Sequence, residues 1–193
     1  MTITRINYSD IGGISRLHEK YLPSPSSLIG RAYLHILYRA LLEDSDTCIG
    51  FVARDNGAIV GAIFATKDLG KTQKQITRAL IPAGIPHVIR AVFSGMVSWV
   101  ELWQTMRFEL ALMSAFPAPY ATIVTLFVTP THRRHGVGQQ LVRAVTHELR
   151  NEETSLLHVD TQKENIIAQQ FYTTLGFSPV KEIVDSVVFL KKI

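Results

Sequence analysis

The chain has 193 residues, of which 47% are hydrophobic and 19% are charged, a composition that excludes disorder as its main state. Its 20 Lys and Arg residues outnumber its 16 Asp and Glu residues by four. That surplus is too small to indicate a nucleic-acid partner. A single cysteine, Cys48, excludes an internal disulfide and a Cys-based zinc site, and no Cys/His cluster predicts another metal site.

The N-terminal residues and the apolar segments predict a cytoplasmic protein without a transmembrane span. Residues 1–9 are polar and show no signal peptide. Residues 81–116 are the most apolar, but their longest uncharged run, between Arg90 and Glu101, is about half of the roughly 20 residues that a bilayer requires. The lone cysteine also favours a reducing compartment.

The N-terminal part of the chain predicts a strand, two helices and a β-hairpin. Ile3 and Ile6 alternate with polar residues, and Asp55-Asn56-Gly57 is a strong turn signal between two apolar runs. The predicted elements are a strand at Thr2–Tyr8, helices at Ile11–Tyr21 and about Leu28–Leu42, and strands at Cys48–Ala53 and Ala58–Ala65.

A helical insertion is predicted at about residues 67–118. Its apolar residues, among them Trp99, Trp103 and Met106, recur at steps of three and four, with polar residues on the opposite side. Such a stripe is typical of a core-facing helix, of a partner or membrane surface, or of a substrate wall. These alternatives stay open, as does a homodimer formed through the stripe.

Strands and helices alternate again after the insertion, which predicts a mixed α/β fold in a single domain, 1–193. No internal repeat or low-complexity segment interrupts this order. The predicted elements are strands at Ala121–Val128, Leu156–Asp160, Phe177–Val180 and Ile183–Leu190, and helices at Gly136–Arg150 and Glu164–Leu175.

The loop after the strand at Ala121–Val128 has the composition of an anion site. It contains Arg133 and Arg134, followed by Gly136 and Gly138 where a helix begins. Free N–H groups and the positive end of a helix dipole attract an anion, glycine lets the ligand approach the backbone, and arginine adds charge. The loop is therefore predicted to bind phosphate.

Two common phosphate motifs do not fit the chain. A dinucleotide-binding fingerprint needs Gly or Ala at position 141, where Leu141 stands. Gly70-Lys71-Thr72 is similar to the end of a P-loop, but Ala65 occupies the position of its first glycine. Dinucleotide binding and nucleotide hydrolysis are therefore disfavoured.

Two other motifs resemble the GNAT superfamily of acetyl-CoA-dependent N-acetyltransferases. The loop reads Arg133-x-x-Gly136-x-Gly138, which is similar to that superfamily's Arg/Gln-x-x-Gly-x-Gly/Ala signature. The second motif is Asn165-x-x-Ala168-x-x-Phe171-Tyr172-x-x-Leu175-Gly176-Phe177. The two occur in the expected order, separated by a helix and a strand, and the resemblance covers residues 120–190.

The resemblance implies a GNAT-like acyltransferase fold, in which helices flank a central mixed, mostly antiparallel sheet. It implies acetyl-CoA as the co-substrate, no metal, and direct attack by a primary amine of a small molecule. The strand before the loop would splay from its neighbour and bind pantetheine through its backbone, and amides of the loop would bind the pyrophosphate. The implied cofactor-binding residues are Leu126, Phe127, Val128, Arg133, Arg134, His135, Gly136, Val137, Gly138, Gln139, Asn165 and Tyr172.

The resemblance also implies that Tyr172 is catalytic and protonates the leaving thiolate, which a phenol can do because it is protonated at neutral pH. Asn165 and Tyr172 are seven residues apart, which predicts that they share a helix face. Many relatives carry Glu or Asp where this chain has Thr125.

The general base therefore stays open, and the candidates are Glu101, Glu109, Asp160 or a histidine acting through water. The missing strand carboxylate also leaves an alternative function, a catalytically silent acyl-CoA-binding or interaction module.

Overall fold

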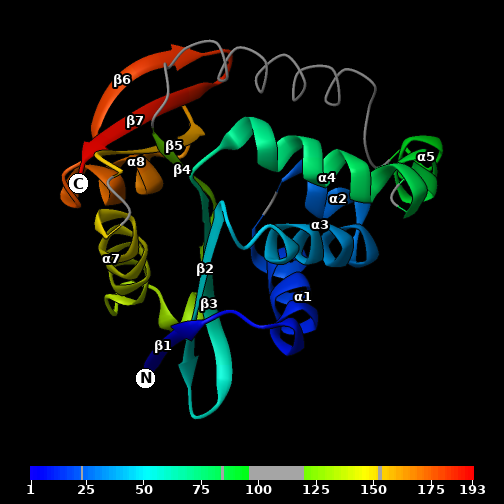
Figure 1. The fold of residues 1–193 in the computed structure, drawn as a ribbon, viewed down its shortest axis with the longest axis horizontal. Helices are drawn as coiled ribbons and strands as arrows, with labels where there is room; N and C mark the ends of the chain where they lie inside the picture. The colour runs from blue at the N-terminus through cyan, green and yellow to red at the C-terminus, as the bar shows by residue number, and fades with distance from the viewer. Residues whose placement is uncertain (23, 84, 96–119, 152–153) are drawn as a thin grey trace.

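The computed structural model describes residues 1–193 except residues 23, 84, 96–119 and 152–153 (Figure 1). The described strands form one seven-stranded sheet in the order β1-β2-β3-β4-β5-β7-β6. Only the β4–β5 pair is parallel, and the other neighbours are antiparallel. The strands are β1 (Thr2–Arg5), β2 (Cys48–Asp55), β3 (Ala58–Thr66), β4 (Ala121–Val128), β5 (Leu156–Gln162), β6 (Ser178–Ile183) and β7 (Ser186–Lys192).

Helices cover both faces of the sheet, with α7 and α8 on one side and α1, α2, α3 and α4 on the other (Figure 1). The α-helices are α1 (Ile11–Tyr21), α2 (Pro25–Ile29), α3 (Arg31–Glu43), α4 (Leu69–Ala83), α5 (Ile85–Phe93), α7 (Val137–Arg150) and α8 (Ile166–Thr174). Two short 3₁₀ helices are η1 (Tyr8–Asp10) and η2 (Pro130–His132). This arrangement confirms the predicted mixed α/β fold with a mostly antiparallel sheet.

Two hydrophobic cores lie on opposite faces of the sheet, and the alternation of side chains along β3 separates them. Ile63 and Ala65 pack in the core beneath α7 and α8. Ala62 and Phe64 pack in the core beneath α1 and α3. Because side chains of a strand alternate between faces, one short apolar run supplies both cores.

The predicted helix at about Leu28–Leu42 is wrong in its boundaries, because two helices, α2 and α3, occupy this region. Ser24 begins α2 with a capping box, and Pro25 occupies its first turn. Gly30 then adopts φ 110° and ψ 174°, which interrupts the helical hydrogen bonds. Helix α1 and strand β4, in contrast, have the predicted bounds.

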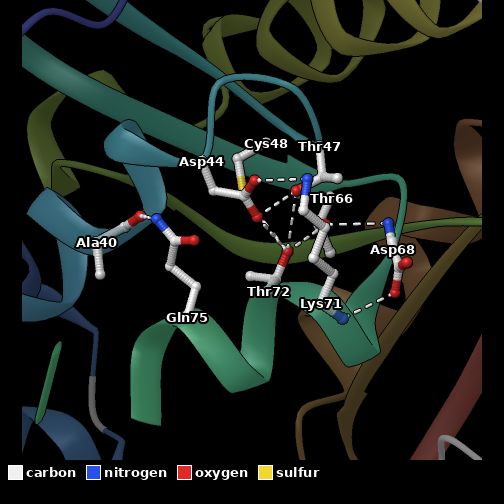
Figure 2. A network of polar contacts seen from close by, with 9 residues as sticks. All are labelled: Ala40, Asp44, Thr47, Cys48, Thr66, Asp68, Lys71, Thr72 and Gln75. Carbon is white, nitrogen blue, oxygen red and sulfur yellow. Dashed lines mark hydrogen bonds and ion pairs between the residues drawn. The ribbon is translucent and has the colours of Figure 1, made fainter. Parts of the chain in front are cut away.

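Helices α4 and α5 lie in the first part of the predicted insertion. A buried polar network at the start of α4 holds it against β3 and the end of α3 (Figure 2). The Thr72 hydroxyl lies 2.6 Å from that of Thr66, and it donates to Asp44 at 3.4 Å. The rest of the predicted insertion, with Trp99 and Trp103, falls outside the described residues.

Each described helix is shorter or less apolar than a membrane span needs. None of them meets both requirements alone, whereas Leu69–Ile81 and Ile85–Phe93 meet them as a pair that is bent by 77°.

Candidate active site

Strand β4 has an open backbone edge over most of its length. Its ladder with β3 runs from Thr122 to Val128, whereas its parallel pairing with β5 ends after Ala121↔Leu157 and Thr122↔His158. Within the described strands, the rest of β4 therefore has no partner on the β5 side. Unpaired backbone N–H and C=O groups in the middle of a sheet can bind an extended ligand as another strand would.

The three strand residues predicted to bind pantetheine do not all face this edge. The Thr129 N–H donates to the Val60 carbonyl of β3 at 2.8 Å. Since successive strand residues direct their backbone groups to opposite sides, Phe127 also faces β3, and Leu126 and Val128 face the open edge. The Phe127 side chain is buried beneath α1 and α3. The structure thus places two of the three backbone positions at the edge.

The loop that follows β4 presents a series of free amides. Among the described residues, no acceptor bonds the N–H groups from Arg134 to Gln139, and no side chain caps α7. The backbone has φ 62° at Arg134 and 76° at Gly136, and a Cβ placed on Gly136 would meet no atom within 4 Å. Successive free amides at a helix N-terminus form a cradle for an anion.

The loop side chains differ in their availability to a ligand. Arg133 Nε donates to the Val128 carbonyl at 3.0 Å, which holds the guanidinium beside the open edge of β4. The side chains of Arg134 and His135 are exposed, and that of Val137 is buried beneath the helix. Val137 can therefore contribute only its amide, whereas Arg133 and Arg134 can contribute charge.

The second motif places its two polar residues differently from expectation. Asn165 Oδ1 accepts the Ala168 N–H at 3.1 Å and caps α8, so Asn165 precedes the first turn of the helix and does not share a helical face with Tyr172. Tyr172 is buried, with its ring centroid 5.2 Å from that of Phe171 and 5.5 Å from that of Phe177.

Tyr172 is protonated at neutral pH in this environment. Burial raises the pKa of its hydroxyl above the usual value, and the negative charge of Asp160 raises the pKa further. The two motifs also touch, because a Cβ on Gly138 would lie 3.1 Å from Phe171 Cζ. A glycine at this position of α7 lets the two helices approach.

A β-bulge in β4 directs Thr125 toward the face covered by α1 and α3. The register with β3 shifts between Phe64 and Ala65, which leaves Val124 as an extra residue. Thr125 lies close to the Tyr38 hydroxyl of α3, where burial raises the pKa of that hydroxyl and the Thr125 side chain lowers it in part. The residue that replaces the usual carboxylate therefore belongs to a buried polar chain.

That chain continues through His18 of α1. The Tyr38 hydroxyl lies 2.5 Å from His18 Nδ1, and His18 Nε2 lies 2.9 Å from Ser24 Oγ. Both rings are almost fully buried, whereas Thr125 and Ser24 are half-buried. Burial lowers the pKa of His18 to about 4, so the imidazole is neutral at pH 7. Sequence spacing did not indicate this chain, because its members lie far apart on separate elements.

The predicted candidates for the general base are only partly described. Asp160 lies in β5 and is close enough for its charge to affect Tyr172. Glu101 and Glu109 fall outside the described residues. In the part of the chain that is described, His, Cys, Asp and Glu side chains form no group of three or more that could hold a metal ion.

Comparison with known proteins identifies the family to which the chain belongs. The sequence model of the Acetyltransferase (GNAT) family matches residues 14–177. Uncharacterized N-acetyltransferase YobR of Bacillus subtilis is 32% identical over 63 residues, which are 33% of this chain and 26% of YobR. Aminoglycoside N(6')-acetyltransferase type 1 of Salmonella typhimurium is 33% identical over 75 residues, which are 39% of this chain and 49% of that enzyme. The matched stretch thus spans half or less of these relatives.

A solved structure shows the same fold at low sequence identity. Aminoglycoside N-acetyltransferase AAC(6')-Iy, solved in complex with CoA, superposes with a TM-score of 0.60 at 17% identity and covers 95% of this chain and 96% of its own. The family match extends over most of the chain, including the open strand, the amide loop and both motifs. The protein therefore belongs to the GNAT acetyltransferase family.

Proposed function

We propose that the protein transfers the acetyl group of acetyl-CoA to a primary amine of a small molecule. The observation that carries this proposal is the continuity of the open β4 edge with the free amides of residues 134–139. The pantetheine arm of CoA is extended and ends in a diphosphate. It can therefore bind along an open strand edge that is followed by an anion-binding loop. The solved relative that superposes on this chain contains CoA, which supports the assignment.

The residues present fit acetyl-CoA. The amides of residues 134–139 would bind the pyrophosphate, with charge supplied by Arg133 and Arg134. The outward backbone groups of Leu126 and the N–H of Val128 would pair with the amides of the pantetheine arm, since the Val128 carbonyl already accepts from Arg133. When bound, acetyl-CoA supplies the acetyl thioester, whose C–S bond is replaced by a C–N bond to the amine, with release of the CoA thiol.

Tyr172 would supply the proton that the departing sulfur needs. Its hydroxyl stays protonated at neutral pH because burial and the nearby charge of Asp160 disfavour the phenolate. A donor that is protonated before the reaction suits this step, because the departing thiolate is the base that accepts the proton.

Thr125, Tyr38 and His18 would carry away the proton that the incoming ammonium must lose. The proton would enter at the Thr125 hydroxyl and reach His18 Nδ1 through Tyr38. A neutral imidazole has one N–H, so His18 can accept a proton at Nδ1 and release the one at Nε2 through the half-buried Ser24 hydroxyl to solvent. This chain takes the place of the strand carboxylate.

The acceptor is proposed as a small-molecule amine because aminoglycoside acetyltransferases occur among the matching relatives. An amine panel would therefore begin with aminoglycosides and continue with amino sugars. The alternative, a silent acyl-CoA-binding module, is favoured by the absence of a carboxylate at Thr125, and it predicts binding without turnover of any amine.

Calorimetric titration with acetyl-CoA tests the proposal, with CoA and ATP for comparison. Saturable binding of acetyl-CoA is expected, and Gly136→Val is expected to weaken it at least tenfold because a side chain enters the open cradle. Gly57→Val is the matched control, since Gly57 has a similar φ of 80° and equally open surroundings in the β2–β3 turn. Absence of binding to the folded protein, or equal weakening by both substitutions, would exclude this site.

A further inference from the structure

The net positive charge of the chain is concentrated on α4 and α5. Residues 69–93 contain Lys71, Lys74, Arg78 and Arg90 and no Asp or Glu, a net charge of four. The remaining 16 basic and 16 acidic residues cancel, so this segment accounts for the whole surplus of the chain. Such a concentration creates a local positive field that the overall composition does not reveal.

The same segment exposes large apolar side chains. Ile85, Ile89 and Phe93 follow one another at steps of four along α5 and are 45%, 50% and 87% exposed. Ile81, at the end of α4, is 57% exposed. Four large exposed apolar residues within 13 positions are more than isolated surface residues, and such patches mark interaction sites.

Charge and apolar surface share one side of α4. Lys71, Lys74, Arg78 and Ile81 are exposed and follow helical spacing of three, four and three. The opposite side of α4 is fixed by the buried contacts of Thr72 (Figure 2). Lys71 pairs with Asp44 at 3.4 Å, whereas Lys74 and Arg78 form no ion pair with any described residue. We name this set, with Ile85, Ile89, Arg90 and Phe93, the α4–α5 surface.

We infer that the α4–α5 surface binds to a membrane that contains anionic lipids, with α4 and α5 lying along the interface. Basic residues beside exposed apolar residues on amphipathic helices combine attraction to anionic headgroups with insertion of side chains into the acyl boundary. Lys71, Lys74 and Arg78 favour the interface over a span, because charges are costly at the bilayer centre. A second copy would instead bring two surfaces of the same charge together. This inference is independent of the function proposed above.

Co-sedimentation of the full chain with phosphatidylcholine vesicles, with and without phosphatidylserine, tests the inference. We expect binding to vesicles that contain phosphatidylserine, weakened by added salt, and much weaker binding to phosphatidylcholine alone. Lys74→Glu with Arg78→Glu should lower the partition coefficient at least about 25-fold, since each cation near an anionic surface contributes about fivefold. Phe93→Asp should lower it about tenfold or more, because it removes the exposed aromatic ring that would insert into the acyl boundary.

Val180→Asp with Lys181→Glu is the matched control, because it exchanges one exposed apolar and one exposed basic residue on the edge strand β6. Circular dichroism confirms that each variant is folded, and acetyl-CoA titration gives a second readout that should not change. Equal binding to both kinds of vesicle, no binding at low salt, or equal effects of the surface and control variants would overturn the inference. So would a dimer in solution that Phe93→Asp dissociates, in the absence of vesicle binding.

Discussion

Two buried histidines are expected to make the folded protein sensitive to acid. His18 is 2% exposed and His158 is fully buried, and burial lowers the pKa of each from 6.5 to about 4. His18 connects the polar chain of α1 and α3, and His158 Nδ1 lies 3.2 Å from the Thr122 hydroxyl at the last paired position of β4 and β5. Burial disfavours the charged form of both rings, so both are neutral at pH 7.

The size of the effect follows from the difference between the folded and unfolded pKa values. Between about pH 6.5 and pH 4, the unfolded chain binds a proton at each histidine and the folded chain does not, so acid favours unfolding. A difference of about 2.5 pKa units at about 1.4 kcal/mol each gives a loss of about 3 kcal/mol per histidine. This stability is fully present above pH 6.5 and is lost as the pH falls to about 4.

Urea unfolding at a series of pH values measures the loss. The free energy of unfolding should fall by about 6 kcal/mol for the two histidines together over this range. His18→Gln should remove about half of that pH dependence, whatever it does to stability at pH 7. His35→Gln, on the exposed side of α3, is the control and should leave the pH dependence unchanged. A ring resonance of His18 that titrates near pH 6.5 in the folded protein would refute the reasoning.

Three further substitutions test the site and its support. Tyr172→Phe should lower turnover, measured by thiol release, about a hundredfold with little change in acetyl-CoA affinity, and equal turnover would leave Tyr172 a packing residue. Tyr38→Phe keeps the ring but breaks the link to His18. Its turnover should fall at least tenfold for amines that are protonated at the assay pH, and a similar loss for a weakly basic, already neutral amine would indicate a structural role. Asp44→Ala should cost about 2 kcal/mol in urea unfolding by leaving buried hydroxyls unsatisfied, whereas exposed Asp46→Ala should cost little; equal costs would contradict the importance of the network.

Much of the secondary structure could be predicted because its signals are local. Helix α1 and strand β4 have the predicted bounds, since apolar periodicity and the flanking residues specify them over a few positions. The boundary between α2 and α3 was missed because Gly30 lies inside a continuous apolar helical pattern. Only the backbone conformation of Gly30, φ 110°, shows that the helix stops there.

The family and the candidate anion-binding loop could be predicted from the sequence alone, because each motif lies within a contiguous stretch whose residue types carry the chemistry. Only the tertiary structure decided where β4 parts from β5, which of Leu126, Phe127 and Val128 face that edge, and what Thr125 contacts. These properties depend on strand register, on a bulge and on helices more than 80 residues away in the chain. Local patterns do not encode such long-range pairings, so the position of His18 and Tyr38 near Thr125 emerged only once the sheet and its helices were assembled.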